Sequence, residues 1–445
     1  MTATHLPLRS GRRRGAALAV ALLTTLAATS CGDDDDAAGG GATSAADDAT
    51  SASAAATSTS EVEPTTSDAT TTSRATTTIA TTTSTTPAPA TPTGPFTADE
   101  IAKIDAAAMA SLTNGTTGTV VSIVDPERGT FLKAYGTANT AGTPMSPDLH
   151  YRIGSVTKTF TADAVLRLVD QGLVALSDPI AKYVDDIPNG DVITIQDLLA
   201  MRSGLFEFSN DQDFYNRYVA DPTLPWTTQD TLAIIRANAP VAAPNTTTAY
   251  NNGNFILLGL VIERVTGQTV QEHLAGLIAQ LGLTSTSFAA GDTMPEPYVT
   301  GYYSDGTTPP PAGGYRDTTV QTPVIPGSAG AIISTVPDMT RYAVELATGA
   351  GLSPETWQAR RTWTPFAASV PGVRVRYGLG ITQLGDWVGH DGSLFGYSNM
   401  VFYLPSEQAA VVVMGNAADQ IAVLSQALWG DIVKLLYPDS LPTWS

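Results

Sequence analysis

The chain has 445 residues, a formal net charge of −19 and a single cysteine. This acidic balance argues against nucleic acid or an anionic membrane surface as a direct partner, because both repel a negatively charged protein. One cysteine excludes an internal disulfide. Four histidines without a His-Glu-x-x-His motif argue against a zinc hydrolase, so we expect no metal and no other cofactor.

The N-terminal segment is typical of an export signal. Four arginines precede an apolar run from Ala16 to Ala28 that is shorter than a membrane span. Small residues before Cys31 resemble a bacterial lipoprotein box, although Ala28 stands where leucine is usual. We therefore expect residues 1–31 to be a signal peptide, and the protein to be exported and anchored at the cell envelope only by a lipid on Cys31. Ordinary cleavage and secretion is the alternative.

Residues 32–95 are a low-complexity tract of Ala, Ser, Thr, Asp and Pro, with too few apolar side chains to bury a core. We predict that this tract is a disordered tether. Residues 1–31 carry +4 and residues 32–95 carry −8, which leaves −15 for residues 96–445. The remaining length of about 350 residues suffices for one large domain or two packed lobes.

Hydrophobic periodicity and turn residues predict the elements of residues 96–445. Strands at both ends with helices between them indicate an α+β fold: an antiparallel β-sheet flanked by helices, plus an inserted all-helical lobe. A stretch rich in Gly, Pro and Tyr over 302–315 is expected to be a long loop that lines a cleft. In chain order we expect a helix over 97–111, strands over 119–124 and 130–135, helices over 151–172, 194–201, after Trp226, from Asn252 to Gly267, over 269–281 and over 335–347, strands over 373–383, 397–404 and 409–414, and a helix over 417–436.

Ser155 and Lys158 open the predicted helix within 151–172. Residues three apart share a face of a helix, so the hydroxyl and the amine can hydrogen-bond. A lysine amine loses its proton near neutral pH only when it is buried, and it can then activate a serine hydroxyl as a nucleophile. A serine N-cap beside a solvated lysine is the alternative, because chance produces such a pair often.

Tyr250 and Asn252 begin the predicted helix that ends at Gly267. A tyrosine oxygen beside a lysine ammonium has its pKa lowered and can relay protons, and we expect this of Tyr250. The Asn252 amide can donate to a substrate carbonyl. A half-buried tyrosine with an asparagine helix cap is the alternative.

A third motif, His390-Asp391-Gly392-Ser393, comes just before the two predicted strands over 397–414. The imidazole of His390 could polarise or protonate a leaving group. Gly392 would let a substrate backbone approach the chain closely. A structural histidine at a strand edge is the alternative.

In this order the motifs Ser-x-x-Lys, Tyr-x-Asn and His-x-Gly resemble those of the penicillin-recognising serine hydrolases. The strings LHYRIGSVTKTFTA, AYNNGNF and GHDGSLFGYS are similar to class C β-lactamases and to the D-alanyl-D-alanine carboxypeptidases that carry His-x-Gly. The resemblance runs from Thr97 to the C-terminus and implies a β-lactamase/transpeptidase-like catalytic domain over residues 96–445, with its site between two lobes. It implies a secreted serine hydrolase that forms a covalent acyl-enzyme with a small-molecule or peptide acyl donor. We expect a monomer.

Carried over by position, the resemblance makes Ser155 the acyl-forming nucleophile, with Lys158 holding or accepting its proton. Tyr250 would be the base toward Ser155 and then the acid toward the leaving group. Asn252 would orient the substrate amide or the Lys158 amine. The backbone N–H groups of Ser155 and Ser393 would form an oxyanion hole. The substrate-binding positions would be Asn252, His390, Gly392 and Ser393.

Asp391 departs from the family pattern, because relatives that bind a substrate carboxylate usually have Thr or Ser there. A carboxylate at this position would repel a C-terminal D-alanine or a β-lactam carboxylate, unless it points away or pairs with Arg374 or Arg376. An esterase or amidase of the same family is therefore an alternative to a β-lactamase or carboxypeptidase. A non-catalytic cell-surface binding module with this fold is another.

Overall fold

The computed structural model describes residues 96–304, 315–366, 373–418 and 424–441. The predicted signal peptide, Cys31 and the predicted tether lie outside these residues, as does most of the predicted loop over 302–315. Within the described ranges, no helix is long and apolar enough to cross a membrane.

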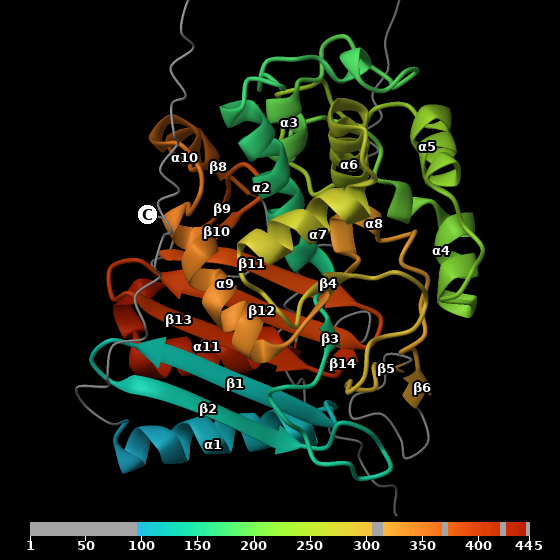
Figure 1. The fold of residues 1–445 in the computed structure, drawn as a ribbon. Coiled ribbons are helices and arrows are strands. Elements are labelled where there is room, and N and C mark those ends of the chain that lie inside the picture. Colours follow the sequence, from blue (N-terminus) through green and yellow to red (C-terminus); the bar gives the residue numbers. More distant parts are fainter. Residues whose placement is uncertain (1–95, 305–314, 367–372, 419–423, 442–445) are drawn as a thin grey trace, which may run out of the picture. The chain divides into compact units, whose positions relative to one another are not determined.

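An eight-stranded antiparallel sheet is the centre of the domain, with the strand order β2-β1-β13-β12-β11-β10-β9-β8 (Figure 1). The two ends of the domain meet in the sheet, where β1 pairs with β13 and Thr119 lies opposite Gly415. This confirms the prediction of a sheet built from both ends. Its strands are β1 (Gly118–Asp125), β2 (Gly129–Gly136), β8 (Thr364–Pro365), β9 (Val375–Tyr377), β10 (Thr382–Leu384), β11 (Trp387–Leu394), β12 (Tyr397–Leu404) and β13 (Ala409–Gly415).

Helices cover both faces of this sheet (Figure 1). Helix α9 (Val336–Thr348) crosses β12 and β13 on one face, while α1 (Ala98–Thr113) and α11 (Leu424–Leu436) pack together on the other. A strand covered on both faces is apolar at consecutive positions rather than at alternate ones. The run Ala-Ala-Val-Val-Val-Met-Gly of β13, buried at every position, follows this rule.

The all-helical lobe is built around two helices, α2 (Thr157–Asp170) and α6 (Asn252–Thr266), which pack against each other. Both are buried on nearly every side, as expected for helices at the centre of a lobe. Gly267, with φ of 71°, ends α6 as predicted, because a left-handed residue closes a helix most readily when it is glycine. The other helices before α9 are α3 (Ile195–Leu199), α4 (Gln212–Ala220), α5 (Thr228–Ala237), α7 (Val270–Gln280) and α8 (Gly327–Gly330).

Two predicted motif placements are corrected by the structure. Ser155 lies in a 3-10 turn, η1 (Gly154–Val156), directly before α2 rather than within the α-helix. The motif from His390 to Ser393 lies inside β11 and not in a segment before the strands. Ser155 is therefore held by the turn that leads into α2, and the His390 motif by the sheet instead of by a loop.

Other differences concern element boundaries. The strand predicted over 373–383 is two short strands, because the chain turns between them at Gly380, whose φ is 69°. The last helix is described over Leu424–Leu436 and does not begin at Ala417 as predicted, since Ala417–Ala418 form β14 beside β5. The unpredicted helices and strands are α4, α8, α10 (Pro354–Arg360), β3 (Tyr151–Arg152), β4 (Ser287–Phe288), β5 (Tyr302–Ser304), β6 (Tyr315–Asp317), β7 (Ile332–Ser334), β8, β11 and β14.

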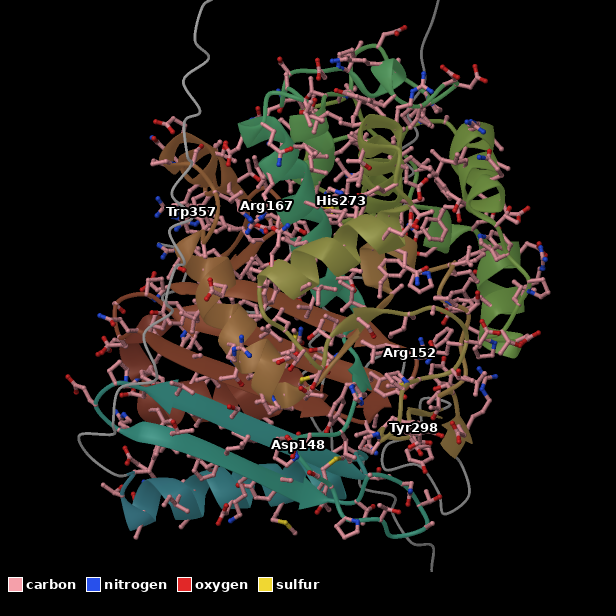
Figure 2. The ribbon with its side chains drawn as sticks, in the orientation of Figure 1. Asp148, Arg152, Arg167, His273, Tyr298 and Trp357 are labelled. Atoms are coloured by element: carbon pink, nitrogen blue, oxygen red, sulfur yellow. The ribbon has the colours of Figure 1, made fainter. Side chains whose placement is uncertain are left out.

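A buried ion pair joins α10 to α2. The Arg360 side chain is 1% exposed and donates to Asp163 and to the Thr159 carbonyl, each at 3.0 Å. Asp163 also accepts from Arg167 at 2.7 Å. Figure 2 labels Arg167 on α2 and Trp357 on α10, the two helices that this cluster connects. The cluster fixes the helix that follows Ser155.

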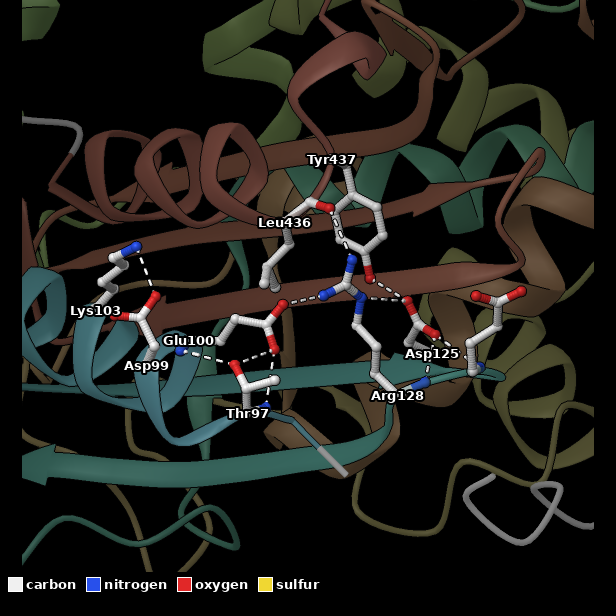
Figure 3. Close-up of polar contacts among 9 residues, drawn as sticks. Thr97, Asp99, Glu100, Lys103, Asp125, Arg128, Leu436 and Tyr437 are labelled. Atoms are coloured by element: carbon white, nitrogen blue, oxygen red, sulfur yellow. Dashed lines mark hydrogen bonds and ion pairs between the residues drawn. The ribbon is translucent and has the colours of Figure 1, made fainter. Parts of the chain in front are cut away.

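A second polar cluster joins α1, the β1–β2 turn and the end of α11 (Figure 3). Arg128 donates to the Glu100 carboxylate and, at 3.2 Å, to the Leu436 carbonyl. It also lies 3.6 Å from an Asp125 oxygen and 5.6 Å from the ring centroid of Tyr437. One guanidinium thus connects the first and last helices of the described domain through the turn between two strands.

We expect Arg128→Ala to lower the free energy of unfolding by about 1–3 kcal/mol, because several partly buried acceptors lose a charged donor at once. Urea denaturation of the full chain measures this change. The matched control is Lys103→Ala on α1, the helix that carries Glu100; it removes only an exposed pair with Asp99 and should cost about 0.5 kcal/mol or less. Equal effects of the two substitutions would contradict a central role for Arg128.

Candidate active site

Ser155 lies where three separate segments meet: the turn η1, the residues that begin α6, and strand β11. The Tyr250 hydroxyl donates to Ser155 Oγ at 2.6 Å. The Lys158 amine lies 3.1 Å from the same oxygen. The structure therefore brings together the serine, lysine and tyrosine that the sequence singled out. Ser155 and Tyr250 are both partly exposed, so that a substrate can reach them.

The Lys158 side chain is completely buried. Burial lowers the pKa of its amine from 10.5 to about 7, since an ammonium loses its hydration in the protein interior. The negative charges of Glu207 and Asp391 act in the opposite direction and limit the fall. Near neutral pH a substantial fraction of Lys158 is therefore a neutral amine that can accept a proton.

The neighbours of Lys158 decide which way its lone pair points. Its nitrogen lies 2.8 Å from Asn252 Oδ1 and 2.9 Å from the Ala329 carbonyl oxygen. Both oxygens can only accept hydrogen bonds, so they take the two N–H groups of the neutral amine. The lone pair is then left to face the third neighbour, Ser155 Oγ. Lys158 is thus oriented to take the serine proton.

Glu207 fixes the orientation of the Asn252 amide. Its carboxylate accepts from Asn252 Nδ2 at 2.9 Å and also from the Asn252 backbone N–H. Because a carboxylate can only accept, the amide nitrogen must face Glu207 and the amide oxygen must face Lys158. Of the two roles open to Asn252 in the sequence, orienting the Lys158 amine is the one this geometry supplies.

The pKa of Tyr250 is raised, contrary to the expectation from the sequence. Burial is the largest cause and the neighbouring Tyr377 phenol adds to it. The hydrogen bond to Ser155 acts against them, and the negative charges of Asp391 and Glu207 raise the pKa by smaller amounts. Tyr250 is therefore a neutral phenol that donates a proton. The expected lowering assumed a protonated lysine beside the phenol, and the low pKa of Lys158 removes that assumption.

Backbone contacts between η1 and β11 hold Ser155 beside Ser393. Gly154 has a φ of 53°, and a Cβ on it would lie 2.7 Å from the Ser393 carbonyl oxygen and 2.9 Å from its nitrogen. A Cβ on Gly392 would lie 1.9 Å from the Ile153 carbonyl oxygen. The close approach that Gly392 permits is thus that of Ile153, and not that of a substrate. Ser393 itself is exposed.

His390 is fully buried beneath this contact. Its Nδ1 bonds to the Asp391 carbonyl oxygen and its Nε2 lies 3.1 Å from the Tyr377 hydroxyl. Burial lowers the pKa of His390, the nearby Lys158 lowers it further, and Asp391 opposes both effects. With both nitrogens engaged inside the protein, the ring supports β11 and does not supply a proton to a leaving group.

The arginines that could have neutralised Asp391 do not do so. Arg374 pairs instead with Asp386, at 2.9 Å. The ion pair recorded for Asp391 among the described residues is with the ring of His390, 3.7 Å away. The Asp391 carboxylate therefore has no arginine partner in the part of the chain that the structure describes, and it acts on Lys158 and Tyr250, whose pKa values it raises.

Sequence reasoning missed Glu207 and Tyr377. Glu207 lies between Phe206 and Phe208, and no local pattern around it could have drawn attention to it. Tyr377 lies in a short strand that the sequence did not separate from its neighbour. Across the described ranges, no group of three or more His, Cys, Asp or Glu side chains could hold a metal ion.

Comparison with known proteins agrees with this geometry. The family model named Beta-lactamase matches residues 101–428. An unguisins hydrolase of Aspergillus campestris is 29% identical over 326 residues, which cover 67% of this chain and 58% of the relative. The chain thus spans less than two thirds of the length of that curated relative.

Solved structures show the same fold. A D-stereospecific amidohydrolase from a Streptomyces species has a TM-score of 0.67 and 27% identity, covering 76% of this chain and 98% of its own. An octameric penicillin-binding protein homologue from Pyrococcus abyssi has a TM-score of 0.66 and 26% identity, covering 77% and 79%. The chain therefore belongs to the beta-lactamase family of penicillin-recognising serine hydrolases and has their α+β fold.

Proposed function

We propose that this protein is an acyl hydrolase that works through a covalent acyl-enzyme on Ser155. The observation that carries the proposal is the hydrogen-bonded chain from the Tyr250 hydroxyl through Ser155 Oγ to the Lys158 amine. A serine needs an adjacent base to become nucleophilic, and the lowered pKa of Lys158 provides one near neutral pH. A binding module without catalysis would have no use for a desolvated amine at this place.

In the acylation step, Ser155 Oγ attacks the substrate carbonyl carbon while its proton passes to the neutral Lys158 amine. The C–X bond then breaks, and the departing group X takes the proton of the Tyr250 phenol. The proton on Lys158 restores the phenol, so that the net transfer is from Ser155 to X. Water attacks the acyl-enzyme in the second step, releases the acid and returns a proton to Ser155.

The negative charge that develops on the carbonyl oxygen needs donors in place before the reaction. The N–H groups of Ser155 and Ser393 are the candidates, and the backbone contact of Gly154 with Ser393 supports their proximity. Ser155 also lies at the start of α2, where the helix dipole favours negative charge.

For the substrate we propose an amide or ester whose leaving group bears no carboxylate. The unneutralised Asp391 supports this choice over a β-lactam or a D-alanyl-D-alanine peptide, the substrates that the sequence resemblance implied. The likeness to a D-stereospecific amidohydrolase supports an amide. Export, lipidation of Cys31 and the monomeric state stay predictions from the sequence.

Substitution of the nucleophile tests the proposal directly. Ser155→Ala should abolish labelling by a fluorophosphonate, because the attacking oxygen is gone, whereas Ser146→Ala, outside the site, should label like the wild type. Intact-mass and peptide mass spectrometry locate the adduct. Labelling of the Ser155→Ala protein, or an adduct on another residue, would refute the assignment.

The pH dependence of acylation should follow the Lys158 amine. Only the neutral amine accepts the serine proton, so kcat/KM for p-nitrophenyl acetate should rise about tenfold per pH unit on the acid side and level off above a midpoint of about 7. Lys158→Arg should remove the activity, because a guanidinium stays protonated. A flat profile between about pH 5 and pH 8 would contradict a lysine base.

Glu207→Gln should impair the reaction without removing any group that contacts the substrate. Loss of a charged acceptor for the Asn252 amide should lower the plateau of kcat/KM about 10- to 100-fold. Loss of the negative charge should also move the midpoint of the pH profile to lower pH, since Glu207 raises the pKa of Lys158. The control is Asp213→Asn on the exposed surface of α4. An unchanged midpoint would show that Glu207 does not act on Lys158.

A further inference from the structure

Asp391 is a nearly buried carboxylate without a cation of its own. The residue is 8% exposed, yet no lysine or arginine among the described residues forms an ion pair with it. Its one such contact is with Nδ1 of His390, and burial lowers the pKa of that ring. A carboxylate in this position is costly unless something compensates its charge.

The charge of Asp391 acts on the side of the site where the leaving group departs. The His390 ring lies between this carboxylate and two phenols: its Nδ1 is 3.7 Å from Asp391, its Nε2 is 3.1 Å from the Tyr377 hydroxyl, and its centroid is 6.5 Å from that of the Tyr250 ring. Burial raises the pKa values of both phenols and Asp391 raises them further, in keeping with this short separation. In the proposed reaction Tyr250 gives its proton to the departing group. That group must therefore lie beside Tyr250, within the field of Asp391.

Glu207, the other acid near the nucleophile, is fully occupied. Its carboxylate accepts from two N–H groups of Asn252 and from the hydroxyl and the backbone N–H of Ser209. Asp391 has no comparable set of donors among the described residues. Of the two carboxylates, Asp391 is the one left to interact with a substrate.

We infer that Asp391 selects substrates whose leaving group carries a positive charge, such as an ammonium, and discriminates against leaving groups that carry a carboxylate. The inference rests on the proposed acyl-enzyme function. It assigns to Asp391 the recognition of the leaving group, while Ser155, Lys158 and Tyr250 carry out the bond changes. The net charge of −19 on the chain adds a long-range attraction for cationic substrates.

Three phenylacetate esters with leaving groups of similar size test this inference in the full chain. Their alcohols are choline, which is cationic, 3,3-dimethylbutanol, which is its neutral isostere, and 3-hydroxypropanoate, which is anionic. The ratio of kcat/KM for the cationic ester to that for the neutral ester should fall about tenfold or more in Asp391→Asn, as expected for loss of a partly desolvated charge pair. Asp391→Glu should retain most of the preference, and Asp391→Ser should raise the relative turnover of the anionic ester.

A ratio within one variant cancels the effect of residue 391 on the Lys158 amine, and comparing that ratio between variants cancels the intrinsic reactivity of each ester. The matched control is Asp386→Asn, which removes an exposed carboxylate at the β10–β11 turn and should leave all ratios unchanged. Hydrolysis of the neutral ester with ratios that do not depend on residue 391 would overturn this inference alone. Failure of all three esters to acylate Ser155 would overturn the proposed function and the inference with it.

Discussion

The desolvation of one amine underlies the chemistry of this site. Lys158 is surrounded by protein on every side, and the loss of hydration favours its neutral form. Glu207 and Asp391 oppose that effect, and the balance leaves the pKa close to 7. Additional carboxylates around Lys158 would raise its pKa and keep the amine protonated, so that it could not act as a base. A wholly apolar one would make it a weaker base than the reaction requires.

The fold supplies the rigid frame that such an amine needs. Helices α2 and α6 pack against each other, and each contributes one side of the Lys158 surroundings. The Asp163–Arg360 pair fixes α2 from the side of α10. The second acceptor of Lys158, the Ala329 carbonyl oxygen, belongs to α8, which packs against both helices. Helices α2, α6 and α8 must therefore all be packed in their correct positions before the lone pair of Lys158 can face the Ser155 hydroxyl.

Much of this arrangement could be predicted from the sequence. The spacing of Ser155 and Lys158, and the order of the motifs that followed, identified the residues that the structure brings together. Alternation and turn residues gave the antiparallel sheet and the main helices. The strand motif around His390 was misplaced, because β11 holds several polar residues and glycines that do not look like a strand.

What the sequence could not show was the consequence of burial. The expected lowering of the Tyr250 pKa was wrong, since it depended on a protonated Lys158, and protonation depends on three-dimensional surroundings. Glu207 was missed for a similar reason. It lies 45 residues before Asn252, and only the folded chain makes it the partner of that amide.

Because of the contact between η1 and β11, the position of the oxyanion donors and the preference for a substrate depend on different parts of the chain. Evolution can therefore change one of these two properties without the other. Gly154 and Gly392 let main chain touch main chain there, so the candidate oxyanion donors are held without help from any side chain. Asp391 precedes Gly392 in β11, and because the contact is made by main chain, its side chain can be exchanged without moving those donors. New substrate preferences in such a scaffold can therefore arise by replacing one residue of the strand, while the geometry that stabilises the transition state is inherited intact.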